Sequence, residues 1–432
     1  MISIAKCLLG VFLYILVWNT EAEGGTINAL SCSRNDVQAA INSANVGDTV
    51  EIPSGNCTWS SKIVVTKSIS IIGGGIGNTV ITDGVSGDNL IELGNSSSTI
   101  APRLSGMTIK GSASKSGFKA MIQLAGLSSG LGFRIDHISF YHWTNEAIQT
   151  WDGVWGVIDH CNFTENGGGY AIYFRHDRWN GVGDWGDNSW ADADGFGTYK
   201  FVFIEDSTFS TSASSSVVYS DSCGGARYVY RYNTFNNGNI RSHGTDSTPR
   251  VRGTRSVEVY NNAFENNLSG GPHDTVFEYR SGTLLFYNNT ISGSVGFDWG
   301  PALRLNRNSG TTWWPPCTGS FALDKNQPGL SGYLCLDQPG AGQADYFSEG
   351  NGGSNGWTGI SPYTWPNQAS SPVFMWNNTG YNVGEGGGSD IRIQANRDYY
   401  LSPKQGYTAY TYPHPLQGGG PAVPTNLRIL LQ

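Results

Sequence analysis

Charged residues are scarce in this sequence, making up 14% of its 432 residues, and the formal net charge is −8. Aromatic residues make up 12%, which excludes a disordered chain, since disorder goes with few aromatics and a high net charge. The composition also excludes a helical bundle or coiled coil, because those are rich in Ala, Glu, Lys and Leu. The acidic balance argues against DNA or RNA as a partner, because nucleic acids are bound by basic surfaces.

Long apolar runs are also missing. The run from Cys7 to Trp18 is too short to span a bilayer, and no later run is long enough. Lys6 precedes this run, and Thr20-Glu21-Ala22 places small residues where signal peptidases cleave. We therefore predict that residues 1–22 are a signal peptide and that the chain is secreted.

Cysteine is the third scarce residue, with seven in the chain, of which Cys7 belongs to the predicted signal peptide. The even remainder indicates disulfides outside the cytosol, although six cysteines allow fifteen pairings. We predict the pairs Cys32–Cys57 and Cys317–Cys335. Cys161 and Cys223 either pair with each other or remain buried thiols.

Glycine, in contrast, is abundant: 59 residues, about twice the usual ~7%. Six segments share one alternating apolar and polar pattern that turns at a small polar residue: RIDHISF, VIDHCNF, FIEDSTF, VYRYNTF, VEVYNNAF and LLFYNNTI. Alternation with period two predicts strands, and a repeat of roughly 20 to 30 residues predicts the stacked coils of a solenoid. We therefore predict an all-β chain.

Aligning the six segments predicts two ladders. One is an apolar column inside the solenoid, formed by Ile135, Ile158, Ile204, Tyr230, Val259 and Phe286. The other is an asparagine column at a bend, formed by Asn233, Asn262 and Asn289. Each asparagine amide is expected to bond its neighbour one coil away, at about 4.8 Å along the axis. A β-sandwich would also alternate, but it would not place asparagines in register at one point of a repeat.

The elements RIDH and VIDH resemble the Trp-Ile-Asp-His element of pectate lyases, without its Trp. The segment DVQAAINSANVGDTVEIPSG is similar to the N-terminal capping helix and first coil of the same proteins. Over roughly residues 28–401 the chain thus resembles the pectate lyase-like superfamily. The resemblance implies a right-handed parallel β-helix with an N-terminal capping helix. It does not fix an activity, because this fold carries lyases, hydrolases, epimerases and binding proteins.

We expect one β-helix domain over residues 23–416, followed by a Gly/Pro linker and tail over residues 417–432. Two long loops interrupt the repeat. One, at residues 175–199, is rich in Trp, Asp and Gly, and the other, at residues 311–353, contains two cysteines.

A second set of strands between the repeats carries the candidate site. Aligned on one inward apolar residue each, these strands place Ile148, Ile172, Val218, Ile240 and Phe277 in one column. The outward face then carries Gln149, Tyr173, Tyr219, Arg241 and Glu278, and two residues further on Trp151, Arg175, Asp221, His243 and Arg280. Residues i and i+2 of a strand share a face, so these side chains are predicted to form one patch.

The mixture of arginines and aromatic rings predicts a groove for an acidic polysaccharide. A polysaccharide lyase must hold a uronate carboxylate and remove the proton next to it. Arg241 and Arg280 suit the first task, and His243 suits the second, with Tyr219 as the alternative base or acid. The residues expected to bind substrate are Arg175, Trp151, Tyr173, Arg252 and Trp179.

Other interpretations of these residues stay open. His243 is also explained as a structural histidine at a turn, and the arginines as ion pairs with Asp221 or Glu278. Asp221 and Glu278 are at the same time candidate Ca²⁺ ligands. The alternative functions are a non-catalytic carbohydrate-binding solenoid and a β-helix glycoside hydrolase, which would need two carboxyl groups flanking the bond.

Overall fold

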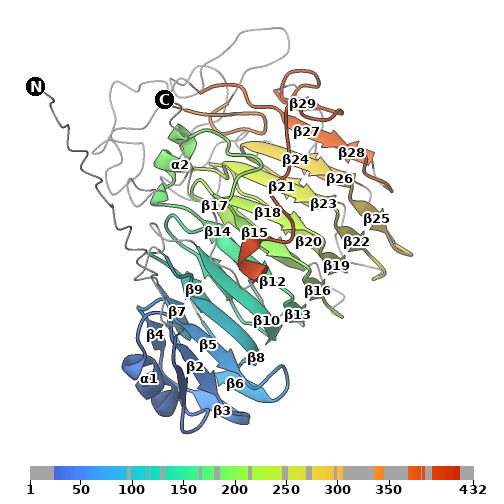
Figure 1. Ribbon diagram of the computed structural model, residues 1–432. Helices are drawn as coiled ribbons and strands as arrows, with labels where there is room; N and C mark the ends of the chain where they lie inside the picture. Colours follow the sequence, from blue (N-terminus) through green and yellow to red (C-terminus); the bar gives the residue numbers. More distant parts are fainter. Residues whose placement is uncertain are drawn as a thin grey trace, which may run out of the picture.

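The computed structural model shows a parallel β-solenoid of about ten turns (Figure 1). It describes residues 24–94, 99–112, 114–115, 117–126, 132–164, 168–179, 185–212, 217–245, 252–268, 275–295, 299–304, 335–344, 368–380, 382–384 and 392–418. The predicted signal peptide, residues 1–22, lies outside these residues, as does most of the predicted loop at residues 311–353. No helix among the described residues is long and apolar enough to cross a membrane.

Each turn contributes up to three strands, which stack in parallel into three rows. The first row contains β2 (Thr49–Ile52), β5 (Ser70–Gly73), β8 (Arg103–Gly111), β10 (Phe133–Tyr141), β12 (Gly156–Asp159), β15 (Val202–Glu205), β18 (Arg227–Arg231), β21 (Ser256–Tyr260), β24 (Thr283–Tyr287), β27 (Val373–Trp376) and β29 (Tyr399–Tyr400). β1 (Thr26–Asn28) pairs with β2.

The second row contains β3 (Gly55–Trp59), β6 (Thr79–Asp83), β13 (Asn162–Thr164), β16 (Thr208–Ser210), β19 (Thr234–Asn236), β22 (Ala263–Glu265) and β25 (Thr290–Ser292). The long strands β8 and β10 belong to both of these rows. The third row is a separate sheet, with β4 (Ile63–Val65), β7 (Ile91–Leu93), β9 (Ala120–Leu124), β11 (Glu146–Thr150), β14 (Tyr170–Arg175), β17 (Val218–Cys223), β20 (Asn239–Arg241), β23 (Thr275–Tyr279), β26 (Trp299–Leu303) and β28 (Asn382–Gly384).

The predicted apolar column is confirmed. Ile135 pairs with Ile158, Ile158 with Ile204, and the register continues through Tyr230, Val259 and Phe286, all fully buried. A second column of stacked phenylalanines, Phe140, Phe163, Phe209, Phe235 and Phe264, runs beside it, with ring centroids 4.6 to 4.8 Å apart. Repeated side chains one strand spacing apart thus hold the turns in register.

The asparagine ladder is also confirmed. The Nδ2 of Asn233 donates to Oδ1 of Asn262, and the Nδ2 of Asn262 donates to Oδ1 of Asn289, each at 3.0 Å. Asn378 extends the ladder by one turn. The residue before each ladder position has a positive φ, for example 59° at Tyr232 and 56° at Asn261, and this sharp bend joins the first row to the second.

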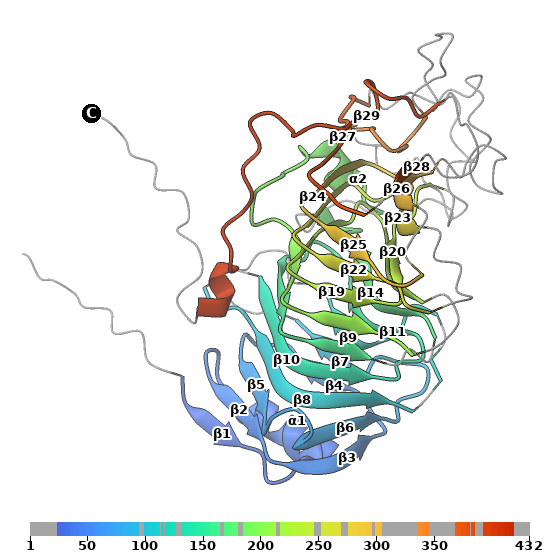
Figure 2. The ribbon, with the colours of Figure 1, turned by 90° about the vertical axis from the view of Figure 1, so that its right-hand side faces the viewer.

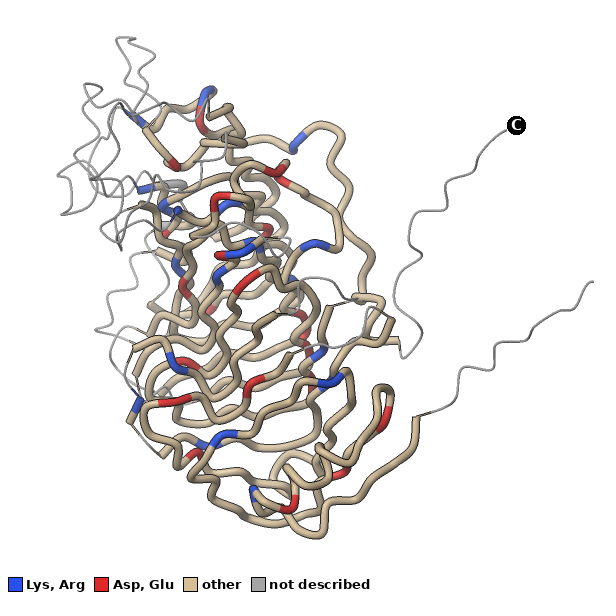
Figure 3. Tube along the Cα trace, turned by 90° about the vertical axis from the view of Figure 1, so that its left-hand side faces the viewer, with Lys and Arg blue, Asp and Glu red and all other residues tan. Residues whose placement is uncertain are grey.

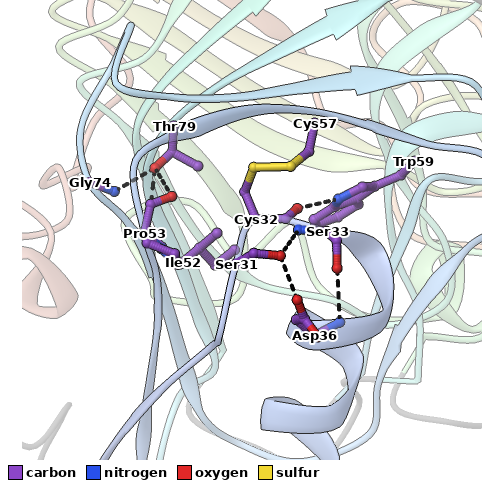
Figure 4. Close-up of a disulfide and its surroundings, with 10 residues drawn as sticks. All are labelled: Ser31, Cys32, Ser33, Asp36, Ile52, Pro53, Cys57, Trp59, Gly74 and Thr79. Carbon is purple, nitrogen blue, oxygen red and sulfur yellow. Dashed lines mark hydrogen bonds between the residues drawn. A yellow bond between two sulfur atoms is a disulfide. The ribbon is translucent and has the colours of Figure 1, made fainter.

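The helix α1 (Arg34–Ser43) packs at the N-terminal end of the solenoid against β2, β3 and β4. Its N-cap Ser33 accepts a hydrogen bond from the backbone N–H of Asp36, and Val37, Ala40 and Ile41 are buried. The predicted Cys32–Cys57 disulfide ties the residue before this cap to β3, with the two Cα atoms 5.8 Å apart (Figure 4). The buried Trp59 donates its indole N–H to the carbonyl of Cys32.

The structure also shows the state of three other cysteines. Cys161 and Cys223 are buried free thiols rather than a pair. Cys335 is disulfide-bonded, and Cys317, its predicted partner, lies outside the described residues.

The last described segment, residues 401–418, runs back along the first row, and we call it the C-terminal strap. It passes from β29 down to η4 (Pro415–Gly418), which contacts β10 and β12 (Figures 1 and 2). On the way, buried Arg231 donates to the carbonyls of Tyr410 and Thr411, and Glu205 accepts from the backbone N–H of His414. No sequence pattern predicted this return.

The asparagine ladder generates a stability prediction. Asn262 bonds the carbonyls of Tyr230 and Tyr260, and its Oδ1 accepts from the backbone of Asn233. Asn262→Ala leaves these buried groups unsatisfied and should lower the free energy of unfolding by about 2–4 kcal/mol. In the exposed Asn162→Ala, the control, the change should stay within about 0.5 kcal/mol in urea titrations. An equal loss of unfolding free energy in the two variants would contradict a stabilising role of the asparagine ladder.

The strap generates a prediction about pH. Burial raises the pKa of Glu258, which accepts hydrogen bonds from Tyr407 and the N–H of Gly197, from 4.5 to about 7. Because the folded pKa lies above the unfolded one, this carboxyl stabilises the fold at low pH, and that stability is lost as the pH rises from about 4.5 through about 7. The loss amounts to about 3 kcal/mol at pH 8. In chemical denaturation at a series of pH values, Glu258→Gln should remove this component, and parallel pH profiles of the two proteins would contradict it.

Candidate functional site

The candidate site lies on the outer face of the third row. Gln149 pairs with Tyr173, Tyr173 with Asp221, and Arg241 with Glu278. Ser220 pairs with Ile240, so Asp221 and Arg241, the residues that follow them, are neighbours. Both signs of charge occur side by side in the upper half of the stack (Figure 3).

The structure corrects the predicted register at one strand. Ile172 pairs with Ser220 rather than with Val218, and the register shifts between Val218 and Ser220, where β17 faces β20. This irregularity turns Tyr219 into the core, where its ring packs near Phe209 and its hydroxyl donates to the carbonyl of Asn236 at 2.5 Å. Tyr219 is fully buried, so the role of base or acid does not fit its position.

Asp221 and His243 form a pair. The Nδ1 of His243 lies 2.7 Å from Oδ1 of Asp221, which also accepts the backbone N–H of Ser222. The aspartate side chain is fully buried, and 18% of the histidine side chain is exposed. A carboxylate on Nδ1 favours the tautomer that carries its proton there, which leaves Nε2 as a proton acceptor.

Glu278 is surrounded by three arginines, which we call the arginine cluster. Its carboxylate accepts from Arg241 at 2.9 Å, from Arg280 at 2.6 and 2.9 Å, and from Arg304 at 3.0 Å. Burial alone would raise the pKa of Glu278, but the three guanidinium groups, Arg280 first, hold it below its usual value. Arg241, Arg280 and Arg304 keep 28%, 12% and 24% of their side chains exposed. The guanidinium groups of the cluster are therefore partly exposed at the surface.

Three residues of this region were missed from the sequence. Arg304 follows β26, the next strand after Arg280, so continuing the column by one turn would have found it. Tyr170 begins β14, the strand beside β17, and burial together with the nearby Asp221 raises its pKa. Glu146 pairs with Tyr170 across β11 and β14, and burial raises the pKa of Glu146 to about 8. No local signal marks Tyr170 and Glu146, because only the stacking of turns brings Glu146 beside Tyr170 and β14 beside the strand of Asp221.

The predicted substrate-binding residues divide into two groups. Arg175, Trp151 and Tyr173 lie together: Arg175 sits over the Trp151 ring at 4.1 Å, is buried, and binds Asp177 through two nitrogens. Tyr173 is largely buried, and its hydroxyl lies 3.1 Å from the thiol of Cys223.

The other group is enclosed. Arg252 is fully buried and bonded to Asp337 and Asp187, and Trp179 is fully buried with its N–H donated to Asp192. Both side chains lie where the segment after β14, including α2 (Asp187–Ala191), packs on the solenoid. Neither reaches the surface to bind a polysaccharide, so the expectation for these two residues is corrected. The guanidinium of Arg252, paired with two buried carboxylates, instead holds the packed segments together.

The predicted Ca²⁺ ligands have other partners. Both oxygens of Glu278 accept from guanidinium groups, and Asp221 binds His243. Three arginines would repel a divalent cation, so this donor set does not fit Ca²⁺. Within the described ranges, no group of three or more His, Cys, Asp or Glu side chains is arranged to hold a metal ion.

Comparisons with known proteins add little to this geometry. No protein-family model matches the chain, and no curated protein matches it. Among solved structures, "Geobacillus virus E2 - ORF18" is similar at a TM-score of 0.32 and 18% identity, over 64% of this chain and 59% of that one. This chain therefore matches less than two thirds of the viral protein. The catalytic domain of a GH87 alpha-1,3-glucanase, solved in complex with tetrasaccharides, is similar at a TM-score of 0.33 and 11% identity, over 89% of this chain and 69% of that one. Similarity this low carries no argument about function.

Arg252 provides a test of the corrected assignment. Arg252→Ala leaves the carboxylates of Asp337 and Asp187 without their buried cation. We expect the free energy of unfolding to fall by about 3–5 kcal/mol, measured by thermal and urea denaturation. Arg252→Lys, which keeps the charge, should lose less. If instead both variants keep wild-type stability and weaken polysaccharide binding, Arg252 belongs to the binding site.

Proposed function

We propose that this chain binds an acidic, uronate-containing polysaccharide along the outer face of the third row and cleaves it by β-elimination. The observation that carries the proposal is the position of the Asp221–His243 pair beside the arginine cluster, with Arg241 at the end of β20 and His243 two residues after it. A poised base beside a surface cation cluster is what elimination next to a carboxylate requires.

The arginine cluster would hold the uronate carboxylate. Guanidinium groups bind carboxylates in two places and stay charged at all physiological pH values. Three arginines surround Glu278, and each keeps part of its side chain exposed. The charge that builds up on the substrate carboxylate as its neighbouring C–H bond breaks is thus opposed by fixed positive charge.

The proton transfers balance within the site. Nε2 of His243 takes the proton from C5 of the uronate, C4 and C5 form a double bond, and the bond from C4 to the glycosidic oxygen breaks. Tyr170 gives its hydroxyl proton to that oxygen. The ordinary tyrosine pKa of about 10 keeps this hydroxyl protonated at neutral pH. Burial and the nearby Asp221 raise the pKa of Tyr170 further, so it gives up its proton only as negative charge develops on the leaving oxygen. In this scheme Tyr170 takes the role expected of Tyr219.

We propose that the protein acts outside the cell. The Cys32–Cys57 disulfide fits an oxidising compartment, as the predicted signal peptide does. We propose a right-handed solenoid, because crossovers between parallel strands are right-handed in nearly all proteins. The RIDH and VIDH elements support its assignment to the pectate lyase-like type. Helix α1, with its buried face on β2 and β4, would serve as the N-terminal cap.

The test is an assay for unsaturated products. The purified chain is incubated with pectate, alginate, glucuronan and unsulfated glycosaminoglycans, with and without chelator, and the ultraviolet absorbance of the unsaturated uronate is followed. His243→Ala should lower kcat by about 10²- to 10⁴-fold. Arg280→Ala should both raise KM and lower kcat, and Arg280→Lys should recover part of the lost kcat/KM.

His160 provides a matched control. The Nδ1 of His160 lies 2.9 Å from the buried carboxylate of Asp159, and the Nδ1 of His243 lies 2.7 Å from that of Asp221. His160, however, lies on the turn between the first and second rows. His160→Ala should keep wild-type kcat. A rate unchanged in His243→Ala, or products that are reducing ends without absorbance, would reject the lyase. Binding without any cleavage would support the carbohydrate-binding alternative.

A further inference from the structure

An aromatic surface lies on the third row beside the proposed catalytic groups, and we call it the platform. It consists of Phe118, Trp151, Tyr170 and Tyr173. The Phe118 ring stacks on Tyr173 at 5.9 Å and meets the edge of Trp151 at 6.0 Å, and Tyr170 stacks on Tyr173 at 5.7 Å. Phe118 is 44% exposed, while Trp151 and Tyr170 are half-buried. Phe118 is therefore an exposed aromatic side chain held on other rings.

The platform is held rigidly and is electrically neutral. Arg175 lies between the Trp151 and Phe118 rings, 4.1 and 5.2 Å from their centroids, and its charge is matched by Asp177. Arg178, the exposed arginine of the same segment, lies 3.4 Å from Asp152. Each of these two arginines thus has a carboxylate partner.

A polar side chain without a partner lies in the same place. Gln149 pairs with Tyr173 on the outward side of β11, is fully buried, and neither its Oε1 nor its Nε2 has a hydrogen-bond partner. An unsatisfied buried amide costs about 1–3 kcal/mol, and a ligand that supplies both a donor and an acceptor would remove that cost. Sugar hydroxyl and acetamido groups supply both.

The platform and the arginine cluster lie on one line along the solenoid axis. The strands follow in the order β11, β14, β17, β20 and β23, so Tyr173 and Arg241 are two strand spacings apart, about 10 Å. Tyr170 belongs to the platform and to β14, the strand next to β17, which carries Asp221, the partner of His243. The platform therefore lies next to the leaving oxygen of the proposed reaction, which Tyr170 protonates.

We infer that the platform is a subsite for a neutral sugar. This sugar is the residue expelled from C4 of the uronate. The substrate is then a heteropolymer in which uronates alternate with uncharged sugars. This inference rests on the proposed elimination. A sugar ring stacks its apolar face on aromatic rings, whereas a second uronate placed here would meet arginines already matched by aspartates. The new reducing end would be the neutral sugar.

The test measures binding separately from cleavage. The full chain carrying His243→Ala is titrated by calorimetry with size-matched oligosaccharides of unsulfated chondroitin or hyaluronan, which alternate uronate and N-acetylhexosamine, and of glucuronan, which is all uronate. We expect at least about tenfold tighter binding of an alternating polymer. Adding Phe118→Ala should weaken that binding about five- to tenfold and change glucuronan binding less than twofold. In the chain with His243 intact, Phe118→Ala should raise KM more than it lowers kcat.

Tyr141→Ala is the matched control, because Tyr141 is an exposed aromatic residue, 39% accessible, at the end of β10 on the other sheet. It should leave all affinities unchanged. Equal or tighter binding of glucuronan, or a Phe118→Ala effect no larger than that of Tyr141→Ala, overturns the inference even if unsaturated products form. Preferred, Phe118-dependent binding of an alternating polymer without unsaturated products supports the subsite and rejects the lyase. Binding of none of these polymers overturns both.

Discussion

The stacking of one turn on the next at the bend between the first and second rows is the constraint on which the rest of the structure depends. Each buried asparagine of the ladder bonds the next through its side-chain amide, and its N–H groups also bond backbone carbonyls of two turns. A residue in the left-handed region precedes each of them. Since the amide spacing matches the strand spacing, a slip of one turn against another would break several buried hydrogen bonds at once.

This fixed stack allows the outer face of the third row to act as a site. The side chains that matter come from separate turns: Asp221 from β17, Arg241 from β20, Glu278 from β23 and Arg304 from the end of β26. They meet only because parallel strands place them about 4.8 Å apart along the axis. Such a surface suits a long, regular ligand, because successive subsites repeat with the turns. The proposed ligand would meet aromatic rings at one end of this surface and arginines at the other, and this difference would give it a direction.

Arginine has two different uses in this protein. Arg231 and Arg252 are fully buried. Arg231 binds Glu205 and two backbone carbonyls of the C-terminal strap, and Arg252 binds the carboxylates of Asp187 and Asp337, so they hold the strap and the segment after β14 on the solenoid. Arg241, Arg280 and Arg304 share one glutamate at the surface. Sequence position does not distinguish these uses, which is why Arg252 was expected at the site and Arg304 was not.

The sequence by itself determined the solenoid and its two ladders, because the residues that build them recur at one position of each repeat. The Cys32–Cys57 pair followed from the even number of cysteines outside the predicted signal peptide. It also placed Arg241, His243, Glu278 and Arg280 on one face, since alternation along a strand fixes the face. Only the tertiary structure decided how β17 is aligned, because a shift of two residues keeps the same alternation and is invisible in the pattern. Burial of Tyr219, Trp179 and Arg252 and the meeting of Tyr170 with Asp221 were likewise decided by packing between turns, which no local pattern records.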